Sequence, residues 1–408
     1  MTTAAQWTRR SVVAGMMGTP VLLVAACSGS DPKGSGGGTN GPNGGASAPA
    51  KATKATVTVT PKNGAAGADM TAPVTVTVEQ GTLESVSLTG PDGKQIPGQL
   101  SADRTRWTSS GTLASSSAYK LSAVSKDTAG TTGTTATGFS TGKPAKAFIG
   151  TFNPDHGTTV GVGMPVTITF DNAITNKAAV QKAVMVTADP PVEIVGHWFG
   201  DNRIDFRPQE YWKPGTKVTL TLALKDVEGA KGRYGTQTRT VAFTIGRSQT
   251  SVADLRSHQL TVTRDGKVTQ TFPISGGSPQ HTTWAGKMVI SEKLLQTRMD
   301  SRTVNLGGEY DIADVPHAQR LTTSGTFIHG NYWASGIFGY ENTSHGCVGL
   351  QDAKGAGDPG MPAAKFYNSS MVGDVVEVIN SGDRTVDPAN GLNGWNLDWS
   401  SWKAGSAV

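Results

Sequence analysis

Short runs of alternating apolar and polar residues fill most of the chain between residues 55 and 379. In one of them Val74, Val76 and Val78 are separated by threonines, and turns rich in Gly, Pro and Asp bound many of these runs. A period of two residues places alternate side chains on opposite faces of a β-strand. The pattern therefore predicts a mainly β protein, and a chain of 408 residues has room for about two to four domains.

Two consecutive stretches, residues 55–146 and 147–247, repeat the same features in the same order. Thr60-Pro61-Lys62-Asn63-Gly64 corresponds to Asn153-Pro154-Asp155-His156-Gly157, at an offset of 93 residues. Pro73-Val74-Thr75-Val76 corresponds to Pro165-Val166-Thr167-Ile168, at an offset of 92. A repeat this long is a whole domain rather than a solenoid unit. We expect two Ig-like β-sandwiches without an internal disulfide, acting as spacer and scaffold.

Residues 248–379 predict a third, mostly β domain. Leu260 and Val262 lie on an alternating run that reaches Arg264-Asp265-Gly266-Lys267, and Asp-Gly at this place favours a hairpin turn. The polar, glycine-bearing stretch 304–319 has no strand pattern and is expected to be a long loop. Further expected elements are strands at 326–329 and 375–379 and a helix at 362–368, which has Pro in its first turn.

The first 27 residues have the pattern of a lipoprotein signal peptide. Arg9-Arg10 precede an apolar run that is too short to span a bilayer as a stable helix. The run ends in Val24-Ala25-Ala26-Cys27, which resembles a lipobox, so Cys27 is the expected acylation site. Residues 28–54 are rich in Gly, Ser, Pro and Asn and predict a flexible tether. We therefore expect an exported protein anchored by lipid to the outer face of the cytoplasmic membrane, with Sec and Tat export both open.

Charge and the C-terminal tail add two further expectations. The net charge of +5 comes without a basic cluster interleaved with aromatic residues, so nucleic acid is not an expected partner. In the tail, residues 380–408, Trp395, Trp399 and Trp402 are spaced by four and three positions. That spacing predicts indoles on one face of a helix. We expect the tail to dock between the second sandwich and the third domain.

Candidate chemistry is concentrated in one stretch, where His329 is followed after 14 residues by Ser344-His345-Gly346-Cys347. The chain has two cysteines, so acylation of Cys27 would leave Cys347 as the free thiol. A thiolate is the reactive form of cysteine, and a neighbouring imidazolium that lowers the thiol pKa increases its share. The pattern predicts a nucleophilic Cys347 activated by a histidine that reaches it across a loop.

His329 and the tetrad resemble the signature of the L,D-transpeptidases, cysteine enzymes of the YkuD-type fold that cross-link bacterial peptidoglycan. The likeness extends to Met299, Tyr310, Trp333 and the Trp-rich tail, and is greatest to the two-Ig-domain mycobacterial and actinobacterial members. One position departs from it. The family usually has Asn two positions after the cysteine, and Gly349 stands there. The departure concerns how an acyl donor or a β-lactam is held.

The resemblance implies a role for each matching residue. Cys347 attacks the third-residue carbonyl of a tetrapeptide stem and expels D-Ala, and His329, oriented by the carbonyl of Gly330, moves the proton. Tyr310 and the backbone of Cys347 hold the oxyanion, and an acceptor stem resolves the thioester. Donor and acceptor stems and carbapenems are the implied partners, with no cofactor or metal. Ser344, Trp333, Met299 and Gly346 are implied in substrate binding, and His345 either joins the catalytic set or supports the turn.

Two alternatives from other classes remain. His329, His345 and Cys347 offer two nitrogens and a sulfur, a donor set that zinc accepts, although ligands one residue apart are an uncommon spacing. The second alternative is a non-catalytic Ig-like envelope or wall-binding protein with a degenerate catalytic domain, which Gly349 favours.

Overall fold

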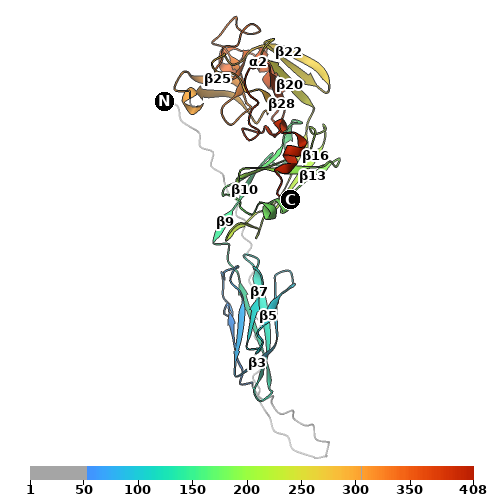
Figure 1. The fold of residues 1–408 in the computed structure, drawn as a ribbon, viewed down its shortest axis with the longest axis vertical. Helices are drawn as coiled ribbons and strands as arrows, with labels where there is room; N and C mark the ends of the chain where they lie inside the picture. Colours follow the sequence, from blue (N-terminus) through green and yellow to red (C-terminus); the bar gives the residue numbers. More distant parts are fainter. Residues whose placement is uncertain (1–52, 305) are drawn as a thin grey trace, which may run out of the picture. The chain divides into compact units, whose positions relative to one another are not determined.

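The structure is a computed structural model that describes residues 53–304 and 306–408 (Figure 1). The predicted signal peptide, Cys27 and all but the last two residues of the predicted tether lie outside the described residues. Within the described ranges, none of the helices has the length and apolar character needed to cross a membrane.

Two four-stranded sheets form the first sandwich. One contains, in spatial order, β1 (Thr56–Thr60), β2 (Thr75–Glu79), β6 (Arg106–Ser109) and β5 (Gly98–Leu100), and the other β4 (Gln95–Ile96), β3 (Gly81–Thr89), β7 (Ala118–Asp127) and β8 (Thr132–Ser140). Alternate residues of β7 are buried, as expected for a strand with one face on a core. Leu83, Trp107 and Leu121 meet in that core.

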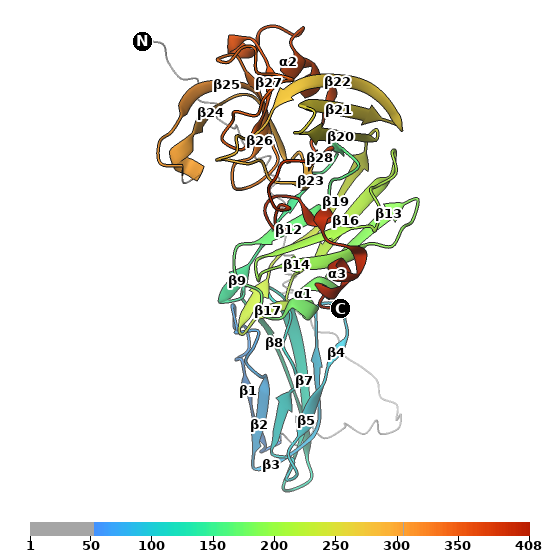
Figure 2. The same ribbon diagram turned by 45° about the horizontal axis from the view of Figure 1, so that its top comes forward.

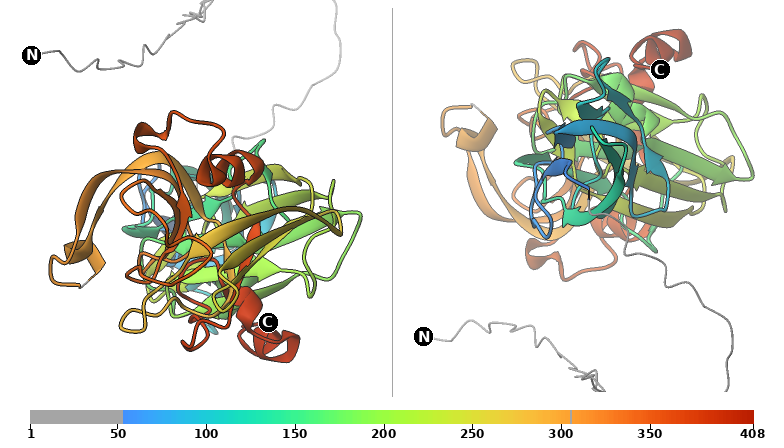
Figure 3. Two further views of the ribbon diagram at one scale, coloured as in Figure 1. Left: turned by 90° about the horizontal axis from the view of Figure 1, so that it is seen from above. Right: turned by 90° about the horizontal axis from the view of Figure 1, so that it is seen from below.

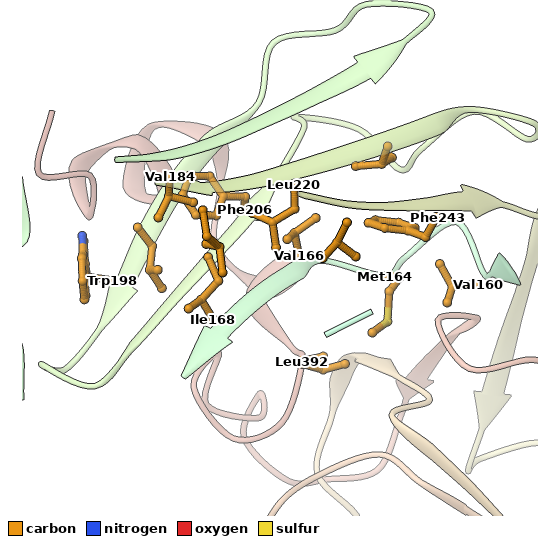
Figure 4. Packing of buried hydrophobic residues seen from close by; sticks show 14 of the residues in the cluster. Val160, Met164, Val166, Ile168, Val184, Trp198, Phe206, Leu220, Phe243 and Leu392 are labelled. Carbon is orange, nitrogen blue, oxygen red and sulfur yellow. The ribbon is translucent and has the colours of Figure 1, made fainter. Parts of the chain in front are cut away.

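The second sandwich repeats this plan. One sheet contains β10 (Gly150–Asn153), β12 (Val166–Phe170), β15 (Arg203–Arg207) and β14 (Val195–Phe199), the other β11 (Thr159–Val160), β19 (Thr238–Ile245), β16 (Lys217–Ala223) and β13 (Val184–Asp189). β10 pairs antiparallel with β12 as β1 pairs with β2, so the repeated motifs occupy corresponding places. Ile168, Phe206 and Leu220 fill the core (Figure 4). A short helix and a small sheet complete the domain: α1 (Lys177–Lys182), β17 (Glu228–Ala230), β18 (Arg233–Gly235) and β9 (Lys146–Phe148).

Nine strands of the third domain are hydrogen-bonded in one continuous order (Figure 2). The order is β23 (Gly286–Val289), β28 (Val375–Ile379), β20 (Gln249–Asp254), β21 (Gln259–Arg264), β22 (Lys267–Ser275), β27 (Val348–Gln351), β26 (Phe327–Asn331), β25 (Asp311–Arg320) and β24 (Glu292–Asp300). The predicted hairpin joins β21 to β22, and Asp265 and Gly266 both have positive φ, as a type I′ turn requires. The predicted helix is α2 (Pro362–Ser369). Its Phe366 packs with Phe272 and Val376 in the core of this domain.

The expectation of a long loop at 304–319 is wrong for most of its length. Residues from Asp311 onward form β25, which pairs antiparallel with β24, and the two strands make the long hairpin seen at the edge of the domain in Figure 3. The outer half of β25 is exposed or half-buried and its inner half is continuously buried, so neither half shows the alternation of a one-sided strand. The connection between the strands is residues 301–310, which begin with the short 3-10 helix η1 (Ser301–Val304).

The C-terminal tail packs against the second sandwich through its tryptophans. The prediction of a single helix face is wrong, because Trp395 lies on the 3-10 turn η3 (Gly394–Asn396) and only Trp399 and Trp402 lie on α3 (Trp399–Ala404). All three indoles nevertheless surround one cation. The guanidinium carbon of Arg207 lies 4.5 Å from the ring centre of Trp395, 5.4 Å from that of Trp399 and 4.3 Å from that of Trp402. Leu392 of the tail joins the core of the second sandwich (Figure 4).

Candidate active site

Two parallel neighbouring strands position the thiol and the imidazole. β26 pairs with β27 so that Ile328 faces Val348 and His329 faces Gly349. Cys347 immediately precedes β27, one step from the level of His329. The backbone N–H of Phe327 donates a hydrogen bond to Sγ of Cys347 at 3.4 Å, and the thiol can donate to the carbonyl of Gly325 at 3.7 Å. The separation of 14 residues thus covers a loop between adjacent strands.

The turn before Cys347 has its own internal support. Gly346 has a φ of 107°, a conformation that strongly favours glycine. The hydroxyl of Ser344 donates to the carbonyl of Cys347 at 2.6 Å and accepts from the N–H of Gly346 at 3.1 Å. Ser344 is therefore a turn residue that fixes the backbone around the nucleophile.

His329 is buried and held in one tautomer. Its Nδ1 lies 2.8 Å from the carbonyl oxygen of Gly330. A carbonyl oxygen only accepts, so the neutral ring carries its proton on Nδ1 and keeps a lone pair on Nε2. The indole of Trp333 stacks on this ring, with centres 5.8 Å apart and planes 19° apart. The side chain that the sequence indicates as the base is therefore oriented as an acceptor of protons.

Burial acts on both groups in the direction that keeps them uncharged. It raises the pKa of the Cys347 thiol to about 11, against a smaller lowering by the Phe327 N–H. Burial likewise lowers the pKa of His329, opposed by its hydrogen bond to Gly330 and by the charge of Asp352. The sequence suggested a thiolate stabilised by an imidazolium, and the direction of both shifts is the opposite. The resting site holds a neutral thiol and a neutral imidazole.

One cavity of about 280 Å³ contains most of the residues that the sequence singled out. Burial, and then the nearby Cys347, raise the pKa of Tyr310 to about 12, so its hydroxyl stays protonated and can donate. Gly330 and Gly346 act through the backbone beside this cavity. The lining includes Cys347, His329, His345, Tyr310, Ser344, Trp333 and Met299.

A second layer of polar residues was missed by the sequence analysis. Oδ2 of Asp352 lies 2.7 Å from Nδ1 of His317, and both side chains are buried. A Cβ built on Gly330 would overlap the same carboxylate, so Asp352 sits against the strand residue next to His329. The one available signal was a charged residue directly after the apolar strand β27. Asn331 also lines the cavity, and its side-chain oxygen accepts from the N–H groups of Trp333 and Ala334.

His345 takes part in a different cluster from His329. Its Nε2 lies 3.0 Å from Oε2 of Glu309, a residue of the connection between β24 and β25. Nε2 of His281 lies 3.3 Å from the same oxygen. In the described part of the chain this trio is the set of His, Cys, Asp and Glu side chains close enough to share a metal ion. The alternative zinc site formed by His329, His345 and Cys347 therefore has no support from the geometry.

Comparisons with known proteins agree with this arrangement. A model of the L,D-transpeptidase catalytic domain of the YkuD type matches residues 248–358, and a bacterial Ig domain model matches residues 65–228. L,D-transpeptidase 2 of Mycobacterium tuberculosis is 34% identical over 358 residues, which are 87% of this chain and 85% of that protein. L,D-transpeptidase 5 of the same species is 33% identical and covers 86% of this chain and 77% of its own length. The chain belongs to the L,D-transpeptidase family.

Solved structures give similar matches to part of the chain. An L,D-transpeptidase from Mycobacterium smegmatis is 28% identical, with a TM-score of 0.44, over 56% of this chain and 96% of its own. An L,D-transpeptidase in complex with imipenem is 29% identical, with a TM-score of 0.48, over 58% of this chain and all of its own.

Proposed function

We propose that this L,D-transpeptidase cross-links peptidoglycan stem peptides through a thioester on Cys347. The observation that carries the proposal is that one cavity contains this thiol and His329, whose Nε2 is free to accept its proton. Sγ bonds to the carbonyl carbon of the third residue of a tetrapeptide stem. The amide C–N bond breaks and D-Ala leaves. The side-chain amine of an acceptor stem then attacks the thioester, forms the new amide and releases the thiol.

The neutral resting state decides how the proton moves. With a thiol pKa of about 11, roughly one thiol in 10⁴ is ionised at pH 7, so a preformed thiolate contributes little. His329 therefore takes the proton as the S–C bond forms and passes it to the departing amine of D-Ala. Its Nδ1 remains bonded to the Gly330 carbonyl throughout, which holds Nε2 toward the reaction.

The developing oxyanion needs donors that are already in place. The Tyr310 hydroxyl stays protonated at physiological pH because its pKa is about 12. We assign it, together with the backbone N–H of Cys347, to the carbonyl oxygen of the donor stem. Trp333 and Met299 on the cavity wall supply apolar contact for the stem, and His345 positions Tyr310, since their ring centres are 5.1 Å apart.

Release of D-Ala from a disaccharide tetrapeptide tests the proposal directly. The wild-type chain is expected to release D-Ala and to form a product cross-linked between third residues. Cys347→Ala should abolish both, whereas Cys27→Ser, which removes the other cysteine, should leave the rate unchanged. D-Ala release by Cys347→Ala at the wild-type rate would refute the mechanism. A wild-type chain without activity would favour the wall-binding alternative.

We also propose that the protein is exported and anchored by lipid on Cys27, with its domains in the cell envelope. The support is the sequence alone, in which Val24-Ala25-Ala26-Cys27 follows an apolar run. Mass spectrometry of the mature N-terminus is the test. A diacylated Cys27 is expected, and an unmodified N-terminus downstream of it would contradict the anchor.

A further inference from the structure

Three segments that are distant in sequence bring His281, Glu309 and His345 together beside the catalytic cavity. His281 lies on the loop between β22 and β23, Glu309 on the connection between β24 and β25, and His345 in the tetrad before β27. Their ligating atoms all lie within 4.8 Å of one another. The side chains are between 28% and 46% exposed, so an ion from solution can reach them.

The spacing of these atoms fits a metal ion. Zinc binds imidazole nitrogen and carboxylate oxygen at about 2.0 to 2.2 Å, so adjacent ligands in a tetrahedron are about 3.3 Å apart. Oε2 of Glu309 lies 3.3 Å from Nε2 of His281 and 3.0 Å from Nε2 of His345. Two imidazoles and a carboxylate suit zinc and its neighbours rather than calcium or magnesium, which prefer oxygen ligands alone.

We infer that His281, Glu309 and His345 form a binding site for a divalent transition-metal ion of the zinc class. The ion bonds to Nε2 of each histidine and to the carboxylate of Glu309, and its fourth position stays open to water. This site shares His345 with the tetrad but includes neither Cys347 nor His329, so it is separate from the reacting groups.

Metal binding at this place would affect the neighbouring catalytic cavity through one residue. Glu309 directly precedes Tyr310, whose ring lies 5.1 Å from that of His345 and which lines the cavity with Cys347. A bound ion ties the connection that carries Tyr310 to the turn that carries the nucleophile. The inferred site thus fixes the position of Tyr310 over the cavity.

The test uses Co²⁺ in the chain carrying Cys347→Ala, because the thiol is itself a metal ligand. One equivalent of Co²⁺ per chain is expected, with visible d–d absorption of a low-coordinate nitrogen and oxygen site and without a sulfur charge-transfer band. Zn²⁺ should displace it. In the same background, Glu309→Gln and His281→Asn should each weaken binding on the order of tenfold or more, since each removes one of three ligands.

Matched controls separate this site from adventitious surface binding. Glu341→Gln and His156→Asn change exposed residues of the same types outside the cluster and should leave the Co²⁺ affinity unchanged. Melting temperatures check that each variant is folded. The inference is overturned if Co²⁺ fails to bind with one-to-one stoichiometry, or if Glu309→Gln binds it as tightly as the Cys347→Ala chain.

Discussion

Nδ1 of His317 lies 2.7 Å from Oδ2 of Asp352, and this buried pair sits against the strand residue next to His329. Successive residues of a strand point to opposite faces, so the carboxylate is on the face of β26 opposite the His329 side chain. Its negative charge raises the pKa of His329, against the stronger lowering by burial. We therefore regard Asp352 as a positioning residue that acts on the base from behind.

Asp352→Asn should move the acidic limb of the pH profile. The substitution removes the charge that favours the imidazolium, so the pKa of His329 falls further and the neutral base persists to lower pH. We expect the rise in kcat/KM for D-Ala release to occur at lower pH than in the wild type. Asp358→Asn, which changes an exposed carboxylate, is the control. An acidic limb that does not move would show that Asp352 has no electrostatic influence on His329.

Gly330→Ala should disturb both stability and the orientation of the base. A Cβ at this position would overlap the Asp352 carboxylate, so the strand or the carboxylate must shift. We expect a destabilisation of about 1 to 3 kcal/mol, as for overpacked cores. D-Ala release should fall more than stability explains, because the carbonyl of Gly330 holds Nδ1 of His329. Gly357→Ala is the matched control, since a Cβ there meets no atom within 4 Å and its φ of −89° suits any residue.

The reactivity of the thiol should follow its raised pKa. With a pKa of about 11, the thiolate fraction rises about tenfold for each pH unit between pH 7 and pH 9. The rate of Cys347 alkylation by iodoacetamide, followed by intact mass, should rise in the same proportion. A rate that is already constant below pH 7 would instead indicate a preformed thiolate and imidazolium pair.

Tyr310→Phe should lower kcat with little change in KM. The phenol donates to an oxygen that becomes negative only as the tetrahedral intermediate forms, so its loss affects the transition state more than substrate binding. Preorganised donors of this kind contribute about 10² to 10³ in rate. D-Ala release with saturating tetrapeptide measures the effect. Tyr340→Phe removes the hydroxyl of a tyrosine that is 79% exposed and should change nothing. Similar kcat values for the two variants would remove Tyr310 from the oxyanion site.

Local patterns in the sequence were sufficient for the parts of the fold that depend on neighbours in the chain. Asp265-Gly266 specifies a turn with two positive φ angles, and the apolar run Val375–Ile379 forms β28 at the predicted residues. His329 and Cys347 could be paired because histidine and cysteine have few roles in an exported chain with two cysteines. Both sandwiches followed from the alternation and from the repeat.

Properties that depend on distant residues could not be predicted in this way. Asp352 and His317 are 35 positions apart, and only the packing of β25 beside the end of β27 brings them together. The thiol pKa depends on how completely the folded chain excludes water from Sγ, which no local pattern indicates. The β24 and β25 hairpin was missed because its outer half buries little and its inner half is buried on both faces.

Gly349 offers the clearest test of how the cavity holds a β-lactam. A Cβ at this position would contact the carbonyl oxygen of Ser275 at 3.6 Å and the side chain of Asn331 at 3.7 Å, which are ordinary van der Waals distances. The cavity therefore accommodates a side chain that this chain lacks, and we expect slow acylation of Cys347 by carbapenems for want of an amide here. Gly349→Asn supplies that amide beside the reacting sulfur.

One hydrogen bond of about 1 kcal/mol corresponds to about a fivefold change in rate, so Gly349→Asn should acylate about fivefold faster. Intact-mass kinetics of adduct formation with a carbapenem measures this. Gly349→Ala adds volume without a donor and should behave like the wild type, which separates the effect of the amide from that of filling space. Equal rates for Gly349→Asn and Gly349→Ala would mean that residue 349 does not contact the bound drug. The interaction would then have to come from Asn331, whose amide lies across the same gap.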